Sequence, residues 1–432
     1  MSTLLPIVQN NQGGGMLLGA GDPRQTAAYS VEVAWPAMAG DAFRLGVSLL
    51  DGPDVLVDAF SVTFGDGPYD DLTAEPGHGV KSVRIRRGRE DQLARMSMGE
   101  CTIVVHDPDG LYNPRNESSP LYGQLLPMRQ VRVRADNGPG PVHLFRGFIR
   151  SIEHDPRRDA RETVINAVDL FVVLSRVSPA LDVVGQTTTG ECIGRILDEV
   201  GWTDPDLRSL DEGDTFEDFS ADGSATALSL IEGLLEAERG QFFIDAAGIA
   251  TYEERHTRPT RPVADTVADT MMAMRPGVDL DQVRNRARVT RQIGEVSGEP
   301  QFVADGASVA AYGPADFGDI TTPYLESDAQ AAQLAGYLAG LLAQPRSPVW
   351  GLEQINRDAT TLTRIIDREL GDRVSVTDSL GSTSGDYLVE GITHDITDGG
   401  KYHRCSWTLS ERGAQVFIVG QSVIAGPDRI SY

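Results

Sequence analysis

The stretch from residue 81 to residue 134 constrains the fold more than any other part of the sequence. Apolar residues and arginines alternate over 83–86, the period-2 pattern of a strand with one buried face. A second apolar run, 101–105, ends at the turn-forming sequence Asp-Pro-Asp-Gly at 107–110, and a third alternating segment follows at 131–134. These segments predict three strands, with one long loop between the last two.

Proline and asparagine residues divide this loop into short turns. Asn113-Pro114, Ser119-Pro120 and Leu126-Pro127 lie within it, and none of these residues is arranged for catalysis. Strands joined by a loop of this kind present a fixed surface. The segment therefore favours a binding or assembly protein.

The pattern along the chain changes from β to α/β and back. Short apolar runs separated by turns continue over 29–176 and predict strands. Helical spacing then predicts two short amphipathic helices, at 192–200 and 227–235, followed by a hairpin at 242–252. A linker rich in proline and arginine follows at 258–262. The middle of the chain is therefore expected to be a small α/β module.

The β pattern resumes near residue 279 and is interrupted once. Ser327 to Gln330 forms a capping box, and a leucine stripe extends the expected helix to residue 342. Three further strands are expected at 373–377, 386–392 and 403–409. No convincing sequence repeat links the two β regions. The predicted fold class is mainly β with an α/β insertion.

Length and composition narrow the class of protein. A chain of 432 residues exceeds one ordinary core and predicts two to four domains. No run approaches the roughly 18 apolar residues of a membrane span, and the first residues lack the features of a signal peptide. We therefore expect a soluble protein made in the cytoplasm. The three cysteines are widely separated and are expected to be free thiols.

The charge is strongly negative, with one basic exception. A formal net charge of -25 disfavours phosphate binding over the surface as a whole. Basic residues gather between Lys81 and Arg89. We interpret this basic segment as a solvated or intersubunit strand face, and contact with nucleic acid is the alternative.

The sequence offers little that is suited to catalysis or metal binding. Its seven histidines have no metal-ligand spacing, and no nucleophile elbow or phosphate-binding loop occurs. Residues 107–110 with Asn113 resemble the start of a calcium loop, but Pro114 follows and Ser118 occupies the position of the bidentate glutamate. Carboxylate pairs such as Asp204 and Asp206 lie in polar loops. We therefore expect no catalytic residue, no metal and no cofactor.

Several motifs, in one order, resemble the tail hub and minor tail proteins of long-tailed bacteriophages. The longest are S-V-R-I-R-R-G-R at 82–89, G-E-C-T-I-V-V-H-D-P-D-G-L-Y-N-P at 99–114 and L-L-P-M-R-Q-V-R-V at 125–133. Further matches lie at Leu144–Ile149, Val164–Leu174, Val283–Arg286 and Gly371–Val374. The resemblance extends from about residue 60 to residue 412.

The resemblance implies two related tube-type β-barrels in one chain and a trimer of chains that forms a pseudo-sixfold ring. The expected division is an N-terminal arm (1–29), a first barrel (30–178), a small α/β domain with its linker (179–275), a second barrel with one helix (276–412) and a C-terminal arm (413–432). The candidate intersubunit interface consists of Arg84, Arg86, Arg87, Asp107, Asp109, Tyr112 and Asn113.

The function that the resemblance implies is structural and not enzymatic. The chain would be a hub at the distal end of a phage tail, located in the tail tip of the virion after synthesis in the cytoplasm of the bacterial host. Its expected partners are two further copies of itself, the distal tail or tube-end ring protein, tail-tip or fibre proteins and the end of the tape-measure protein. Double-stranded DNA would pass through it transiently.

Two other functions belong to different classes. A carbohydrate-binding module of the tail tip would need clustered aromatic residues, but aromatics make up 6% of the chain and its four tryptophans are dispersed. A peptidoglycan hydrolase of the tail tip would need a further domain, and the chain ends about 20 residues after the second expected barrel. We expect no room there for such a domain.

Overall fold

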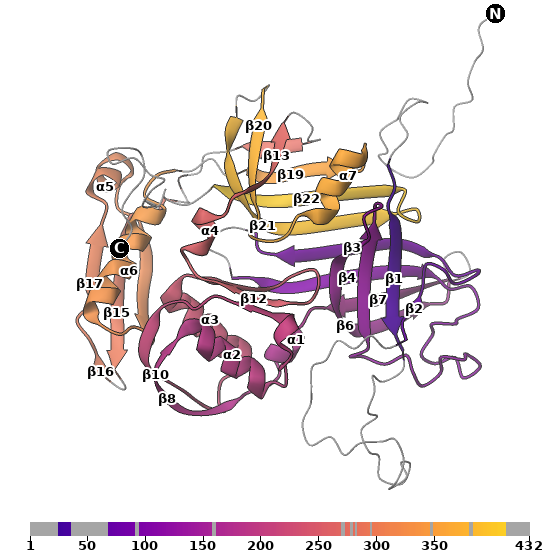
Figure 1. Ribbon diagram of the computed structural model, residues 1–432, viewed down its shortest axis with the longest axis horizontal. Coiled ribbons are helices and arrows are strands. Elements are labelled where there is room, and N and C mark those ends of the chain that lie inside the picture. Colours follow the sequence, from indigo (N-terminus) through magenta and orange to yellow (C-terminus); the bar gives the residue numbers. More distant parts are fainter. Residues whose placement is uncertain are drawn as a thin grey trace, which may run out of the picture.

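The computed structural model describes residues 25–35, 68–90, 95–157, 161–268, 273–276, 280, 283–293, 296–345, 349–379 and 383–411. Figure 1 shows one large sheet with two smaller lobes that contain helices. Apart from residues 25–29, the two predicted arms at 1–29 and 413–432 lie outside the described residues.

The large sheet connects the two β regions of the sequence. Its spatial order is β14 (Ala273–Pro276), β19 (Val349–Ile355), β22 (Tyr402–Glu411), β21 (Thr383–Thr397), β3 (Val80–Gly88), β4 (Ser97–His106), β7 (Glu162–Val168), β6 (Pro141–Asp155), β5 (Gln130–Asp136), β1 (Ala28–Ala34) and β2 (Asp70–Asp71). Strand β20 (Arg373–Asp378) pairs with β21, and β13 (Val263–Ala268) pairs with β20. Because β3 pairs with β21, the first β region is bonded directly to the last.

Alternation along the strands places one face of the sheet in the core, as the sequence predicts. On β3, Val83 and Ile85 are buried and the two arginines beside them, Arg84 and Arg86, are exposed. The core that covers the buried face contains residues from both β regions, including Trp35 near the start and Trp407 near the end. Burial of this shared apolar surface therefore holds the two regions together.

Strands β5–β6–β7 and β20–β21–β22 are two copies of one arrangement. The central strands β6 and β21 are each 15 residues long, and each contains a bulge. The bulge leaves out Arg150 in β6 and Glu390 in β21. Residues 151–155 in the first copy therefore correspond to residues 391–395 in the second.

The correspondence extends to the neighbouring strands. Ile103 of β4 faces Ile165 of β7, and in the same way Leu352 of β19 faces Trp407 of β22. Strand β3 then pairs with β4 as β14 pairs with β19. Each half of the sheet thus contributes four matching strands. They are β3, β4, β7 and β6 in the first half and β14, β19, β22 and β21 in the second, and we call these eight strands the wall.

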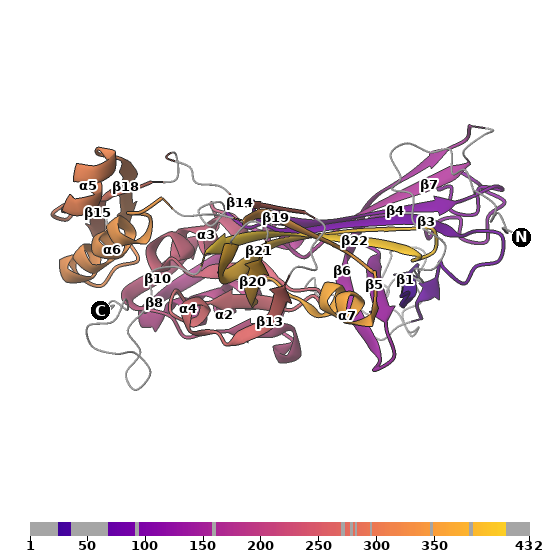
Figure 2. The same ribbon diagram turned by 90° about the horizontal axis from the view of Figure 1, so that it is seen from above.

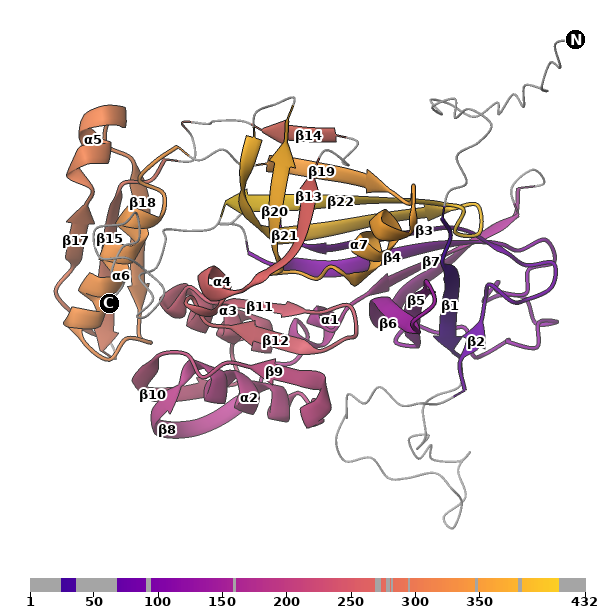
Figure 3. The same cartoon turned by 45° about the horizontal axis from the view of Figure 1, so that its top comes forward.

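The first lobe is the expected α/β module. Its strands are β8 (Ala180–Thr188), β9 (Arg208–Leu210), β10 (Thr215–Asp222), β11 (Gln241–Ile244) and β12 (Ala250–Glu253), and its helical segments are α1 (Phe171–Leu174), α2 (Thr189–Glu199), η1 (Pro205–Leu207), α3 (Ala227–Glu238) and α4 (Thr257–Thr260). The two expected helices and the hairpin are confirmed. Thr188 and Thr226 cap α2 and α3 through their side chains. In Figure 3, α4 and β13 lead from this lobe to the large sheet.

The second lobe lies at the opposite end of the molecule from β1 (Figure 1). It consists of β15 (Arg286–Ile293), β16 (Val296–Ser297), β17 (Gln301–Ala304), α5 (Gly306–Tyr312), β18 (Asp316–Thr322) and α6 (Asp328–Leu341). Helix α6 is the helix predicted from the capping box, and Ser327 accepts a hydrogen bond from the backbone of Gln330. One helix was predicted for 276–412, but α5 and α7 (Ala359–Asp367) are also present.

The mainly β class with an α/β insertion is confirmed. The domain boundaries stay a prediction. Closure of each β region into a barrel also stays a prediction, because the pairings of the large sheet do not close on themselves among the described residues. None of the helices described is both long enough and apolar enough to cross a membrane.

Candidate assembly surface

The wall has a polar face that stays partly exposed among the residues the structure describes. In Figure 2 the wall is seen nearly edge-on, and α7, β13, β5 and β1 all lie on one side of it. The side chains on the opposite, partly exposed face include Ser82, Arg84, Arg86, Glu100, Thr102, Val104, Ser151, Glu153, Asp155, Glu162, Val164, Asn166, Ala273, Glu353, Thr393, Asp395, Thr397, Arg404, Ser406 and Thr408. Most of these are polar. A polar face this broad would remain solvated, or would border a water-filled space.

The polar face carries more carboxylates than guanidinium groups, and two of its arginines lie close to carboxylates on neighbouring strands. Arg84 Nε lies 3.5 Å from Asp395 Oδ1, across the junction between β3 and β21. Arg404 Nε lies 3.1 Å from Glu353 Oε1, between β22 and β19. Exposed pairs of this kind each contribute about 0–1 kcal/mol to folding. They do, however, leave few positive charges free to hold a polyanion such as DNA.

A buried ionic network stabilises the junction between β3 and β21. The Glu390 carboxylate is fully buried and accepts from Arg89 Nε at 2.8 Å, from Arg258 Nη2 at 2.6 Å and from the Ser410 hydroxyl. Burial alone would raise the pKa of Glu390, but the two guanidinium groups outweigh it and lower the pKa far below its usual range. The charged network therefore fixes the bulge of β21 against β3 and α4.

The structure separates the seven predicted interface residues into two groups. Arg84 and Arg86 are exposed on the polar face, Asp109 is exposed on the loop, and Asn113 is half-buried there. Three of the seven, Arg87, Asp107 and Tyr112, are buried within the chain, and Arg87 Nη1 donates to Glu369 at 2.6 Å. The intersubunit role of the set stays a prediction, and the exposed residues are the ones able to make such contacts.

Residues 107–129 form the long loop, and Asp107 anchors its start. One oxygen of the buried Asp107 carboxylate accepts from the Thr163 hydroxyl at 2.7 Å and from the Tyr112 backbone N–H at 3.2 Å. Further turns are fixed by Asn113 and Asn116, whose side chains accept backbone N–H groups two residues ahead. The predicted turn chemistry is therefore confirmed.

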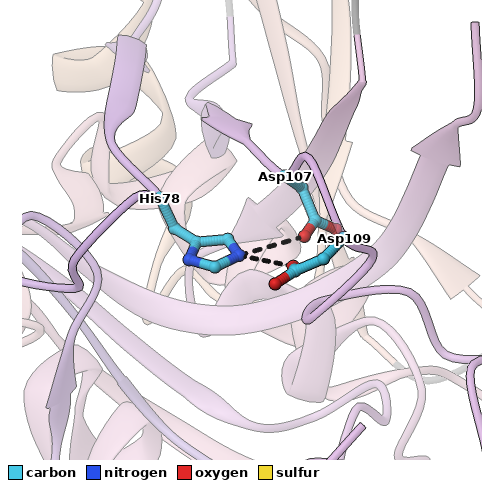
Figure 4. A group of neighbouring side chains, drawn as sticks. All are labelled: His78, Asp107 and Asp109. Atoms are coloured by element: carbon cyan, nitrogen blue, oxygen red, sulfur yellow. Dashed lines mark hydrogen bonds and ion pairs between the residues drawn. The ribbon is translucent and has the colours of Figure 1, made fainter. Parts of the chain in front are cut away.

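His78 contacts this loop, although no sequence pattern indicates it. Figure 4 shows its ring pointing at Asp107 and Asp109. Nε2 of His78 lies 2.6 Å from Asp109 Oδ1 and 3.8 Å from Asp107 Oδ1, and Nδ1 lies 3.1 Å from the Pro76 carbonyl oxygen. Burial works to lower the pKa of His78, but the hydrogen bonds and the two carboxylate charges raise it above its usual value.

Among the residues described, these three side chains form the one cluster able to hold a metal, with ligand atoms within 4.8 Å of one another. The 2.6 Å contact, however, is the length of a charged hydrogen bond. Two ligands of one tetrahedral zinc ion, each at about 2.1 Å from it, stand roughly 3.4 Å apart. The arrangement is therefore that of an ion pair, which ties the turn at His78 to the loop.

Two other histidines lie inside the sheet and are structural. His394 Nδ1 lies 2.9 Å from His403 Nε2, and the Tyr29 hydroxyl lies 2.7 Å from His403 Nδ1. Burial lowers the pKa of His403 to about 3 and that of His394 well below its usual value. Both rings are therefore neutral at neutral pH and link β21, β22 and β1.

The fold described above is similar to that of tail proteins whose structures have been solved. A tail protein from Neisseria meningitidis MC58 aligns with a TM-score of 0.56 and 12% identity, over 89% of this chain and 96% of its own. The 43 kDa tail protein of prophage MuSo2 from Shewanella oneidensis aligns with a TM-score of 0.56 and 12% identity, over 90% of this chain and 99% of its own. No family model and no curated protein matches the sequence. The chain thus shares the overall fold of these tail proteins, as the sequence resemblance implies, while the two closed barrels and the trimer stay predictions.

Proposed function

We propose that three copies of this chain form a structural hub at the distal end of a bacteriophage tail. The observation that carries the proposal is the duplicated wall: each chain holds two matching sets of four strands, bonded side by side. Three such chains would present six similar units in a ring. The likeness to two tail proteins along nearly the whole chain supports the same reading.

The duplication gives a physical reason for a trimer. A ring with six similar units can face a sixfold tube, while its three chains can face a threefold tip. Eight strands from each of three chains, spaced about 4.8 Å apart, would make a wall roughly 115 Å around and roughly 37 Å in diameter. An opening of that order leaves room for duplex DNA even after side chains are added.

The polar face is suited to line such an opening. Its charges are mixed, with more carboxylates than arginines, so a passing duplex would meet no strong positive field to hold it. Its opposite face is the apolar core. We therefore propose that the polar face is turned toward the axis and that DNA passes it transiently.

The remaining contacts follow from the ring. The long loop at 107–129 would contact a neighbouring unit or the distal tail ring, and the two lobes would offer attachment to tip or fibre proteins. The arms would meet the tip or the end of the tape-measure protein. The likeness to tail proteins favours a structural role over a catalytic one, and a location in the virion tail after synthesis in the bacterial cytoplasm.

Immunogold electron microscopy of particles from the source culture, with antibody raised against this chain, tests the proposed location. Label confined to the tail tip is the expected result. Label along the whole tail would contradict a hub. Absence of label from particles that mass spectrometry proves to contain the chain would contradict it as well.

A further inference from the structure

We propose that the long loop at 107–129 packs against the second half of the next copy of the chain, at the end of its β20–β21 ladder, through Tyr122 and Leu126. This contact rests on the proposed hub function, and it gives the loop one partner, a second copy of the chain. Within a single chain, α7 already makes the equivalent contact.

The contact of α7 within the chain is the template. Helix α7 belongs to the second half, and its exposed Thr363 accepts a hydrogen bond at 2.7 Å from the side-chain N–H of Asn137, which follows β5 in the first half. Asp136 fixes this turn, because its carboxylate accepts the backbone N–H groups of Gly138 and Gly140. Helix α7 also contacts β6. The connection of one half therefore lies at the end of the β5–β6 ladder of the other half.

The loop is the matching connection of the first half. It joins β4 to β5, as α7 joins β19 to β20, and the two ladders that follow end in the same way. Asp136 pairs with Pro141 at the end of the β5–β6 ladder, and Asp378 pairs with Thr383 at the end of the β20–β21 ladder.

Repetition of the template around the ring gives the loop its partner. In the proposed ring, first and second halves alternate, so the half that lies beyond the first half belongs to another copy and is a second half. The contact that α7 makes within the chain would then be repeated between chains, by the loop of one copy and the β20–β21 ladder of the next. Such a head-to-tail contact closes at a fixed number of copies.

The loop presents an apolar surface that suits this contact. Tyr122 is 50% exposed and Leu126 is 42% exposed, and Pro120 and Pro127 beside them are exposed as well. Tyrosine is among the residues that most often carry the binding energy of a protein interface. Because the second half has α7 in the place of the loop, a ring of three chains would carry three such surfaces.

The backbone beneath this surface is already fixed. Leu125, between the exposed residues, is buried in the core of the large sheet. The Tyr122 backbone N–H donates to the Ser119 carbonyl oxygen at 3.0 Å, and the Met128 N–H donates to the Ile149 carbonyl oxygen at 2.7 Å. A surface that is ordered before binding loses little conformational entropy when its partner docks. The loop can therefore bind without first folding.

A photo-reactive residue tests which partner the loop contacts. The full chain would carry p-benzoylphenylalanine in place of Tyr122 and would be mixed with isotope-labelled wild type before the trimer assembles. After irradiation, mass spectrometry should find this position joined to β20 or β21 of a labelled copy. The matched control carries the probe in place of Phe302, which is 53% exposed in the second lobe, and should give no such product.

The outcomes separate this contact from the hub itself. In protein that light scattering finds trimeric, a cross-link to another region, a cross-link only within one chain, or none at all would overturn the loop contact and leave the hub standing. Monomers at every concentration, for the wild type as well, would overturn both proposals.

Substitutions supply an independent readout. Tyr122→Ala with Leu126→Ala should weaken trimer formation about tenfold or more in analytical ultracentrifugation, because the loop would lose its two largest exposed side chains. Phe302→Ala removes a similarly exposed ring from the second lobe and should leave trimer formation unchanged. Circular dichroism that matches the wild type would show that both variants fold. Unchanged trimer formation in the double variant, or equal weakening by Phe302→Ala, would contradict the loop contact.

Discussion

The two halves of the wall are alike in strand pairing and different in their connections. Between β4 and β5 the first half has the long loop, whose first residue, Asp107, is bonded to Thr163 and faces His78. The second half has Asn356 at the matching position and α7 in place of the loop. Both residues donate their backbone N–H across to the neighbouring strand, to Arg161 and His403 respectively.

In the proposed ring, the shared strand pairing would join the units to one another, and the different connections would contact neighbouring proteins. The strands must match in both halves if the units are to continue one another around an axis. The connections face outward from that pattern and are free to differ, so each half can present its own surface to a different partner. The following predictions compare equivalent positions in the two halves.

The largest difference in unfolding free energy is expected between substitutions of the two bulge residues, Glu390 and Arg150. Glu390→Ala leaves Arg89 and Arg258 without their buried carboxylate partner, and breaking such a pair costs about 3–5 kcal/mol of unfolding free energy. Its counterpart Arg150 is exposed, so Arg150→Ala should change stability by less than about 0.5 kcal/mol. Urea unfolding measures both variants. Similar losses of unfolding free energy in the two variants would mean that both halves hold their bulges in the same way.

A smaller difference in unfolding free energy is expected between substitutions of the residues that follow the bulges, Gly391 and Ser151. A Cβ at Gly391 would lie 2.7 Å from the Arg89 carbonyl oxygen, so Gly391→Ala should cost about 1–3 kcal/mol through crowding at the junction. Its counterpart Ser151 already has a side chain, and Ser151→Ala should lose its hydrogen bonds with Asn166 and Glu153, about 1 kcal/mol. Equal tolerance at both sites would argue against a tight β3–β21 contact.

The loop of the first half should make stability depend on pH. The raised pKa of His78 stabilises the fold fully below its ordinary pKa of about 6.5, and this contribution is lost as the pH rises through the raised value. The hydrogen bond from His78 lowers the pKa of Asp109, whose contribution is lost as the pH falls below about 4. His78→Gln should therefore lower the thermal midpoint more near pH 5.5 than near pH 9. A difference that grows with pH would contradict the ion pair.

The smallest effect is expected at the exposed pair of the junction. Arg84→Ala should reduce stability by about 0–1 kcal/mol, because the pair with Asp395 is exposed. The control is Arg86→Ala, whose partner Glu90 lies on the same segment. Chemical unfolding at low and high salt distinguishes the two contributions. A loss well above 1 kcal/mol for Arg84 would mean that the charge pair, and not the backbone ladder and core, holds the junction.

Local structure was predictable from the sequence where its physical cause is local. Alternation from Val83 to Arg86 gives the buried and exposed faces of β3, and the capping residue Ser327 begins α6 as expected. The turn sequence after His106 gives the start of the loop. Each of these depends on residues that are a few positions apart.

Contacts between distant segments were not predictable. Nothing in the pattern of β3 identifies β21, some 300 residues later, as its partner, and an exposed strand edge looks the same whether its partner is in the same chain or another. His78 meets Asp107 and Asp109 only because the turn before β3 lies beside the loop. The matching halves share few residue types, so the duplication is visible in hydrogen-bond register and not in the sequence.

Electron cryo-microscopy of the purified assembly, viewed along its axis, tests the central claim most directly. We expect a threefold particle with six similar units around an open centre that the polar face lines. A closed centre, a twofold particle, or a ring whose polar face is turned away from the axis would contradict the proposed hub.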